Sequence, residues 1–121
     1  MSTRATYEFR PTERMYGMRP ASVTVYIHYD GYEDGAAAYF WNAVRSANRR
    51  GCLGTQFVRA NELAELTPGH DSHGDTEFRY TVTGDSWERA ALVVQARNLE
   101  TGRWRRVFGG TVVEFLTAHP R

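Results

Sequence analysis

An alternating segment that passes through an acidic turn into a helix is the feature of this chain that most constrains its fold. Residues 22–29 alternate apolar side chains with polar or aromatic ones, which is typical of a strand with one buried face. The turn at residues 30–35 holds three carboxylates and two glycines. Residues 35–49 then predict a helix. Its apolar face is expected to comprise Ala37, Phe40, Trp41 and Val44. A strand that leads directly into a helix presents the turn between them on a rigid frame.

Capping signals indicate where the helices begin and end. Asp34 can cap the helix at 35–49, because its carboxylate accepts backbone N–H bonds at the positive end of the helix dipole. Gly51 suits the position just after that helix. Thr55 can cap a second helix, which we expect to run to about Leu66.

The remaining strands follow the same period-two pattern. They are predicted at residues 4–10, 77–82, 88–98 and 103–108. We expect Gly109 and Gly110 to break the last of them. Thr111 and Glu114 have the spacing of a capping box and predict a short C-terminal helix, although residues 111–115 also fit a strand.

The predicted order of elements is β-β-α-α-β-β-β-α, which indicates the α+β class. We expect a mainly antiparallel sheet of about five strands, with two helices between strands 2 and 3 and a short C-terminal helix. The chain of 121 residues fits one domain, residues 1–121.

The charge balance gives no general attraction to nucleic acid or to membranes. All 15 basic residues are arginines, and they face 14 acidic residues, so the net charge is +1. No apolar run approaches the roughly 18 residues of a membrane span, and residues 1–5 lack a signal-peptide pattern. The single cysteine, Cys52, cannot form an internal disulfide, which fits a reducing compartment. We therefore expect a cytoplasmic protein without membrane contact, and nucleic acid is not the favoured partner.

One polar loop carries the strongest candidate for metal or acid–base chemistry. Within six residues it holds two histidines and two carboxylates, namely His70, Asp71, His73 and Asp75. Zinc enzymes use such ligands, but the spacing His-Glu-x-x-His is absent. No phosphate-binding glycine loop and no nucleophile elbow occurs, so no cofactor is predicted. A solvated loop is the favoured interpretation, and a small metal-dependent enzyme that uses this loop is an alternative.

Arginines that surround a tryptophan near the C-terminus suggest another alternative. Arg97, Arg103, Arg105 and Arg106 accompany Trp104. Alternation places Trp104 and Arg106 on one face of a strand, and such a face can stack nucleic acid bases. Charged residues also protect sheet edges from aggregation. Because the net charge is close to zero, this protective role is the favoured interpretation of these arginines. An RNA-binding or single-strand-binding domain is therefore the second alternative.

Five runs of residues carry a family resemblance. They are STRATYEF (2–9), YIHYDGY (26–32), GAAAYF (35–40), FVRAN (57–61) and HGDTEFRY (73–80). Together they resemble a family of small proteins found in bacterial genomes, prophages and mobile elements, over most of residues 2–80. The resemblance supplies no known catalytic residues. It implies an accessory role of the kind played by inhibitors of host defence, anti-CRISPR proteins among them.

The favoured functional hypothesis is a non-enzymatic protein-binding module, most specifically a phage or mobile-element inhibitor of a bacterial defence complex. Its contact surface is expected at Asp30, Tyr32, Glu33 and Asp34. Carboxylates beside a tyrosine recognise arginine or lysine through hydrogen bonds and cation–π contacts. The partner is therefore expected to present a basic surface of a host complex, and a homodimer is left open.

Overall fold

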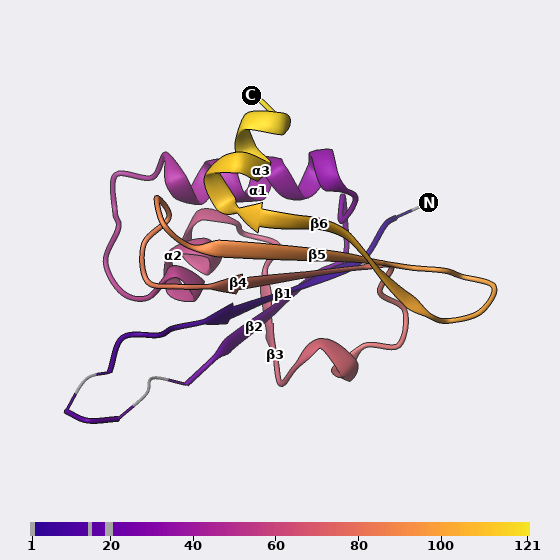
Figure 1. The fold of residues 1–121 in the computed structure, drawn as a ribbon, viewed down its shortest axis with the longest axis horizontal. Helices are drawn as coiled ribbons and strands as arrows, with labels where there is room; N and C mark the ends of the chain where they lie inside the picture. Colours follow the sequence, from indigo (N-terminus) through magenta and orange to yellow (C-terminus); the bar gives the residue numbers. More distant parts are fainter. Residues whose placement is uncertain (1, 15, 19–20) are drawn as a thin grey trace.

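The described residues form one six-stranded sheet with three α-helices. The computed structural model describes residues 2–14, 16–18 and 21–121 (Figure 1). The strands are β1 (Ala5–Arg10), β2 (Val23–Ile27), β3 (Glu65–Thr67), β4 (Phe78–Thr83), β5 (Ala91–Arg97) and β6 (Trp104–Thr111). The helices are α1 (Glu33–Val44), α2 (Leu53–Ala60), α3 (Val112–Ala118) and the 3-10 turn η1 (His70–Ser72).

The sheet is mixed and confirms the predicted α+β class. Its strands lie in the order β3-β2-β1-β4-β5-β6, and every neighbouring pair is antiparallel except β1 with β4. The two central strands are therefore parallel and come from distant parts of the sequence. In Figure 1, α1 and α3 lie above the strands and η1 lies below them.

Aromatic rings fill the core between the sheet and the helices. The rings of Tyr7 and Tyr80, on the parallel strands β1 and β4, are stacked with centroids 4.8 Å apart. Phe40 from α1 and Phe57 from α2 pack over them, with 5.0 Å between the centroids of Tyr7 and Phe57. Both helix residues are fully buried. The predicted core stripes of α1 and β4 therefore meet on this face, although Phe78 at the start of β4 is only partly buried.

The first helix differs from its prediction at both ends. It begins at Glu33 with Tyr32 at the N-cap, and no side chain caps it, so Asp34 lies in its first turn instead. It ends at Val44, whose carbonyl oxygen accepts a hydrogen bond of 2.6 Å from Arg49. Gly51 is therefore not its C-terminal glycine.

The buried face of α1 is also rotated from the predicted one. It comprises Ala36, Ala37, Phe40 and Ala43. Trp41 is only partly buried, lies against the guanidinium of Arg45 and donates from Nε1 to the carbonyl oxygen of His119 at 3.0 Å. Trp41 and Val44, which were predicted on the apolar face with Ala37 and Phe40, are only partly buried and pack against the core, while Ala36 and Ala43 take fully buried positions.

The second helix is shorter than predicted and is followed by an unpredicted strand. It begins at Leu53 with Cys52 at the N-cap, not with Thr55, and ends at Ala60. Asn61 ends it, because its side-chain amide donates to the carbonyl oxygen of Phe57 at 2.9 Å and competes with the next backbone bond. Residues 65–67 form the edge strand β3, although the helix was predicted to continue to about Leu66.

The C-terminal elements settle the alternative left open for residues 111–115. Thr111 and Glu114 form a complete capping box, so Val112–Ala118 is a helix. Strand β6 continues through Gly109 and Gly110, which pair with β5, so the predicted break was wrong. A Cβ on Gly109 would lie 2.4 Å from the guanidinium of Arg106, so the missing side chain makes room for this neighbour. None of the helices in the described part of the chain has the length and apolar character needed to cross a membrane.

Candidate functional site

The face of the sheet opposite the helices is polar, and a loop covers its centre. We call residues 69–76 the histidine loop. His70 lies over the paired strands β1 and β4, with Nδ1 2.6 Å from the Thr6 hydroxyl and Nε2 3.1 Å from the Thr81 hydroxyl. Its side chain is only 13% exposed. Burial is the main cause that lowers the pKa of His70, and the nearby Glu8 carboxylate partly opposes this effect.

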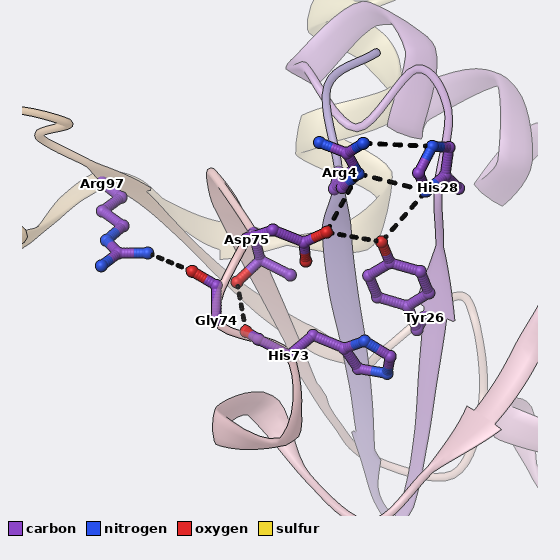
Figure 2. Close-up of polar contacts among 8 residues, drawn as sticks. Arg4, Tyr26, His28, His73, Gly74, Asp75 and Arg97 are labelled. Atoms are coloured by element: carbon purple, nitrogen blue, oxygen red, sulfur yellow. Dashed lines mark hydrogen bonds and ion pairs between the residues drawn. The ribbon is translucent and has the colours of Figure 1, made fainter.

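A second group of contacts fixes the other end of the histidine loop. Figure 2 shows this group, which we call the Tyr26 network: Arg4, Tyr26, His28, His73 and Asp75. The Asp75 carboxylate lies 3.0 Å from Arg4 Nε and accepts from the Tyr26 hydroxyl at 3.3 Å. Arg4 Nε also donates to His28 Nδ1 at 3.1 Å. The His73 ring stacks on Tyr26 with centroids 3.8 Å apart.

The Tyr26 network is better suited to hold the histidine loop in place than to transfer protons. Burial and the Asp75 carboxylate raise the pKa of Tyr26, so its phenol stays protonated at neutral pH. A protonated phenol that donates to a carboxylate holds the loop in place. The adjoining hollow of about 250 Å³ is bordered by His73 and not by Arg4, Tyr26, His28 or Asp75.

The four candidate metal ligands of the histidine loop point to different partners. His70 contacts Thr6 on the face of the sheet, Asp71 pairs with Arg79 at 2.5 Å, His73 stacks on Tyr26 and Asp75 pairs with Arg4. Within residues 2–14, 16–18 and 21–121 no group of three or more His, Cys, Asp or Glu side chains could hold a metal ion. The sequence cluster is thus dispersed by the fold.

The acidic turn lies between β2 and α1 and is anchored from three sides. We use this name for residues 29–34. The Gly31 amide donates to the Thr3 carbonyl oxygen at 2.8 Å, and the buried Tyr80 hydroxyl donates to the Gly31 carbonyl oxygen at 2.7 Å. The Tyr39 hydroxyl donates to the Tyr29 carbonyl oxygen at 3.0 Å. The backbone of the turn is therefore held by both the sheet and α1.

Asp30 adopts a strained backbone conformation, and Gly35 packs closely against its carbonyl group. Its φ is 55°, in the left-handed region that aspartate tolerates better than most residues. A Cβ on Gly35 would lie 2.2 Å from the Asp30 carbonyl oxygen, so only glycine fits there. This close approach sets the direction in which the Asp30 side chain leaves the turn.

The side chains of the acidic turn are exposed. Tyr29 and Tyr32 keep 47% and 46% of their surface, and the Asp34 side chain keeps 82%. Asp34 Oδ1 lies 2.5 Å from His119 Nδ1, and Glu33 Oε2 lies 3.8 Å from His119 Nε2. Among the described residues, the Asp30 carboxylate has no hydrogen-bond or ion-pair partner. Of the four predicted contact residues, Asp30, Tyr32 and Asp34 are exposed and Glu33 is partly buried.

The C-terminal arginines divide between the two faces of the β5-β6 hairpin. Trp104 pairs with Arg97 in the register and lies under the Arg79 guanidinium, 4.0 Å from its ring centroid. Arg105 pairs with Ala96 and points to the opposite face.

Cys52 lies at the N-cap of α2, with Sγ 3.2 Å from the Thr55 hydroxyl, and among the described residues it has no hydrogen bond to a histidine.

No protein-family model, curated protein or solved structure matches this chain. The family resemblance therefore stays an expectation.

Two members of the Tyr26 network, Arg4 and Tyr26, were absent from the sequence-based candidates, whereas His28 was expected to be able to approach the histidine loop. Alternation along β2 places Tyr26 and His28 on the polar face, and Arg4 directly precedes β1. Nothing local indicates that they meet Asp75. That contact depends on the parallel pairing of β1 with β4, in which the Glu77 amide bonds to the Arg4 carbonyl oxygen at 2.9 Å.

Proposed function

We propose that this chain is a non-enzymatic protein-binding module that uses the acidic turn to dock on a basic surface of a partner protein. The observation that supports this proposal is the contrast between the fixed backbone of the turn and the exposed, unbonded side chain of Asp30. The Gly31 backbone is bonded on both sides, at 2.8 and 2.7 Å, while the neighbouring Asp30 side chain makes no bond within the described residues. A group held rigidly before binding loses little conformational freedom on association.

The chemistry of the surface favours arginine or lysine on the partner. Asp30 and Asp34 offer carboxylate oxygens that suit the fork of a guanidinium. Tyr32 stands between them in the sequence and offers a ring face for a cation and a hydroxyl for a hydrogen bond. Tyrosine is also enriched among the residues that dominate binding energy at interfaces.

The finer proposal is that the partner belongs to a bacterial defence complex and that the chain inhibits it. This part rests on the resemblance to proteins of prophages and mobile elements. Defence nucleases carry basic surfaces that bind nucleic acid, and an acidic turn is complementary in charge to such a surface. Inhibition then needs no catalysis by this chain, because occupation of the basic surface excludes the nucleic acid.

The test compares two triple variants that remove the same charge. Asp30→Ala, Glu33→Ala and Asp34→Ala together remove the acidic turn's carboxylates. Glu62→Ala, Glu65→Ala and Glu100→Ala remove three exposed carboxylates elsewhere. Tagged wild type and both variants are incubated with a bacterial lysate, and the captured proteins are quantified by mass spectrometry. Each is also expressed in a strain with active CRISPR defence that is challenged with a targeted phage.

We expect the control triple to retain the captured partner and the protection of the phage, and the acidic-turn triple to lose both while its melting temperature stays close to that of the control. Equal capture and equal protection by the two variants would remove the acidic turn as the contact surface. Capture without any effect on phage survival would retain the binding module and discard the role in defence.

A further inference from the structure

A groove beside the histidine loop contains two arginines whose hydrogen-bonding capacity is incompletely used. The groove has a volume of about 250 Å³ and is lined by Asp71, His73, Gly74, Thr76, Arg79, Arg97 and Trp104. We call it the arginine groove. Arg79 and Arg97 lie on neighbouring strands and on the same face, because Arg79 pairs with Gln95 and Arg97 follows two residues later.

Each of these arginines has one buried donor without an acceptor. Among the described residues, Nε of Arg79 and Nε of Arg97 are buried and have no hydrogen-bond partner. A buried donor of a charged group that lacks an acceptor destabilises the folded protein. The other donors show that both side chains are held in place. Arg79 Nη2 bonds to Asp71 at 2.5 Å, and Arg97 Nη1 donates to the Gly74 carbonyl oxygen at 2.8 Å.

The charge of the arginine groove is only partly balanced from within. Asp71 is the one carboxylate that lines it, and the Asp71 side chain is 92% exposed. In the described part of the chain, Arg97 has no carboxylate within 4.0 Å. Two close guanidiniums with one exposed carboxylate leave a positive excess, which an anion would neutralise.

An aromatic ring and a second hollow adjoin the arginine groove. Trp104 borders both the groove and a hollow of about 580 Å³, which is also lined by Ala96, Arg97, Asn98, Thr101, Arg103 and Arg105. The Arg79 guanidinium covers one face of the Trp104 ring. A flat group that stacks on the ring from the side of the larger hollow would place its own anion near Arg97. Stacking on an aromatic ring beside arginines is the way in which proteins hold nucleotides of a single strand.

We propose that the arginine groove binds the phosphate of a nucleotide whose base stacks on Trp104. The nucleotide is either free or part of a single-stranded nucleic acid, and both sources present the same phosphate and base. The proposal concerns a surface that is distinct from the acidic turn, so it goes beyond the proposed protein-binding function. It also does not require the whole chain to be basic, because one local pair of guanidiniums supplies the contact.

Fluorescence anisotropy tests the arginine groove with a labelled oligo(dT) and a labelled oligo(U), at low and at physiological ionic strength. Unlabelled AMP and inorganic phosphate are used as competitors. Trp104→Ala removes the stacking ring, and we expect it to weaken strand binding by about 5- to 100-fold. Trp104→Phe keeps a ring and should restore most of the affinity, which separates loss of stacking from loss of folding.

A pair of arginine variants tests the phosphate contact. Arg97→Gln removes one charge from the groove, and Arg89→Gln removes one exposed charge at the opposite end of β5. We expect Arg97→Gln to reduce the slope of log K against log salt concentration by about 0.7, whereas Arg89→Gln leaves affinity and slope unchanged. The triple variant of the acidic turn should bind the oligonucleotides like the wild type, so failure of one proposal does not imply failure of the other.

The outcomes are distinguishable. Competition by AMP at concentrations similar to those of the strand supports a free nucleotide as ligand, and competition by strands alone supports a single-stranded nucleic acid. The proposal is overturned if no probe binds, if Arg89→Gln weakens binding as much as Arg97→Gln, or if inorganic phosphate competes as well as AMP while Trp104→Ala has no effect.

Discussion

The two faces of the sheet are covered by different means. On one face, α1, α2 and α3 bury a set of aromatic rings that includes Phe40, Phe57 and Phe115. On the other face, the histidine loop lies on threonines, an arginine and a tyrosine, and each contact is a hydrogen bond, an ion pair or a ring stack. The stabilising free energy of the first kind of cover is roughly proportional to the apolar area buried and does not depend on the direction of the contacts. The second kind depends on the direction of every bond.

The contacts on the helix-covered face therefore determine the stability of the domain, and the contacts on the polar face determine the position of the histidine loop. Burial of large rings supplies most of the free energy that holds a domain together. Hydrogen bonds exchanged with water contribute little each, but they fix where a loop lies. Substitutions on the helix-covered face should therefore unfold the whole protein, whereas substitutions on the polar face should loosen the histidine loop and the arginine groove beside it.

The largest effect is expected for Phe40→Ala on the helix-covered face. Phe40 is fully buried and packs against the rings of Phe57 and Phe115, with centroid distances of 5.3 and 6.1 Å. Its truncation should lower the free energy of unfolding by about 3–5 kcal/mol. The neighbouring Trp41→Ala should cost roughly half as much or less, because Trp41 is only partly buried. Urea denaturation of both variants measures the difference, and equal losses would contradict the observed orientation of α1.

The strands were largely predictable because their pattern is local. Alternation identified β1, β2, β4 and β5 and the face that each buries. The capping box at Thr111 identified α3, because both partners lie within one turn of helix. The end of α2 was not predictable in the same way. Asn61 stops the helix through its side chain, and Asn42 in α1 fixes that side chain with a hydrogen bond of 3.0 Å that no local pattern reveals.

The core was predicted in kind but not in each member. Trp87 lies outside the predicted strands, yet it is 2% exposed and donates from its ring nitrogen to Gln56 at 2.8 Å. Strand β3 was missed because Leu63 and Leu66, which are both exposed, extend the helical pattern of α2. A three-residue edge strand has almost no signal of its own, and its pairing with β2 decides it.

The polar sites show the same limit. The acidic turn was predicted because its residues are contiguous in the sequence. The Tyr26 network joins three segments that are far apart, and pairing of β1 with β4 is needed to bring them together. The arginine groove combines residues of β4, β5, β6 and the histidine loop, and its unpaired donors are visible only in three dimensions.

On the polar face, the largest effect is expected for His70→Ala. The substitution leaves the hydroxyls of Thr6 and Thr81 without their bonds to the imidazole, and Thr6 is fully buried. A buried group that loses its partner costs about 1–3 kcal/mol. The expected loss is therefore smaller than that of Phe40→Ala, and denaturation under the same conditions tests this order.

In the wild type, His70 should also make the free energy of unfolding depend on pH. Because burial lowers the pKa of folded His70 below the unfolded value of about 6.5, the unfolded state binds more protons between the two values. The free energy of unfolding should therefore fall as the pH decreases below about 6.5, until the folded pKa is passed. His70→Ala should have a shallower dependence in that window. Identical slopes in wild type and variant would contradict the burial of a neutral His70.

Two stacked tyrosines in the core should respond in opposite directions to loss of their hydroxyls. The Tyr80 hydroxyl donates to the Gly31 carbonyl oxygen at 2.7 Å, so Tyr80→Phe should cost about 1–2 kcal/mol and release the acidic turn. Among the described residues, the Tyr7 hydroxyl is buried without a partner, and burial raises the pKa of Tyr7. Tyr7→Phe should therefore be neutral or stabilising by up to about 1 kcal/mol. Thermal unfolding of the two variants checks the signs, and a clear loss in Tyr7→Phe would require a hydrogen-bond partner for that hydroxyl.

The smallest effect is expected for His73→Ala, and it tests the comparison most directly. The substitution removes the ring that stacks on Tyr26 but leaves the ion pair of Asp75 with Arg4. An aromatic pair contributes about 0.5–1.5 kcal/mol, and His73 is partly exposed, so the global loss should be at the lower end of this range. Hydrogen exchange should nevertheless accelerate at the backbone amides of residues 69–76, because a loop held by a few directional contacts opens locally without global unfolding. Exchange that increases equally throughout the sheet would show that the polar face is part of the cooperative core, and the proposed separation between stability and position would then be wrong.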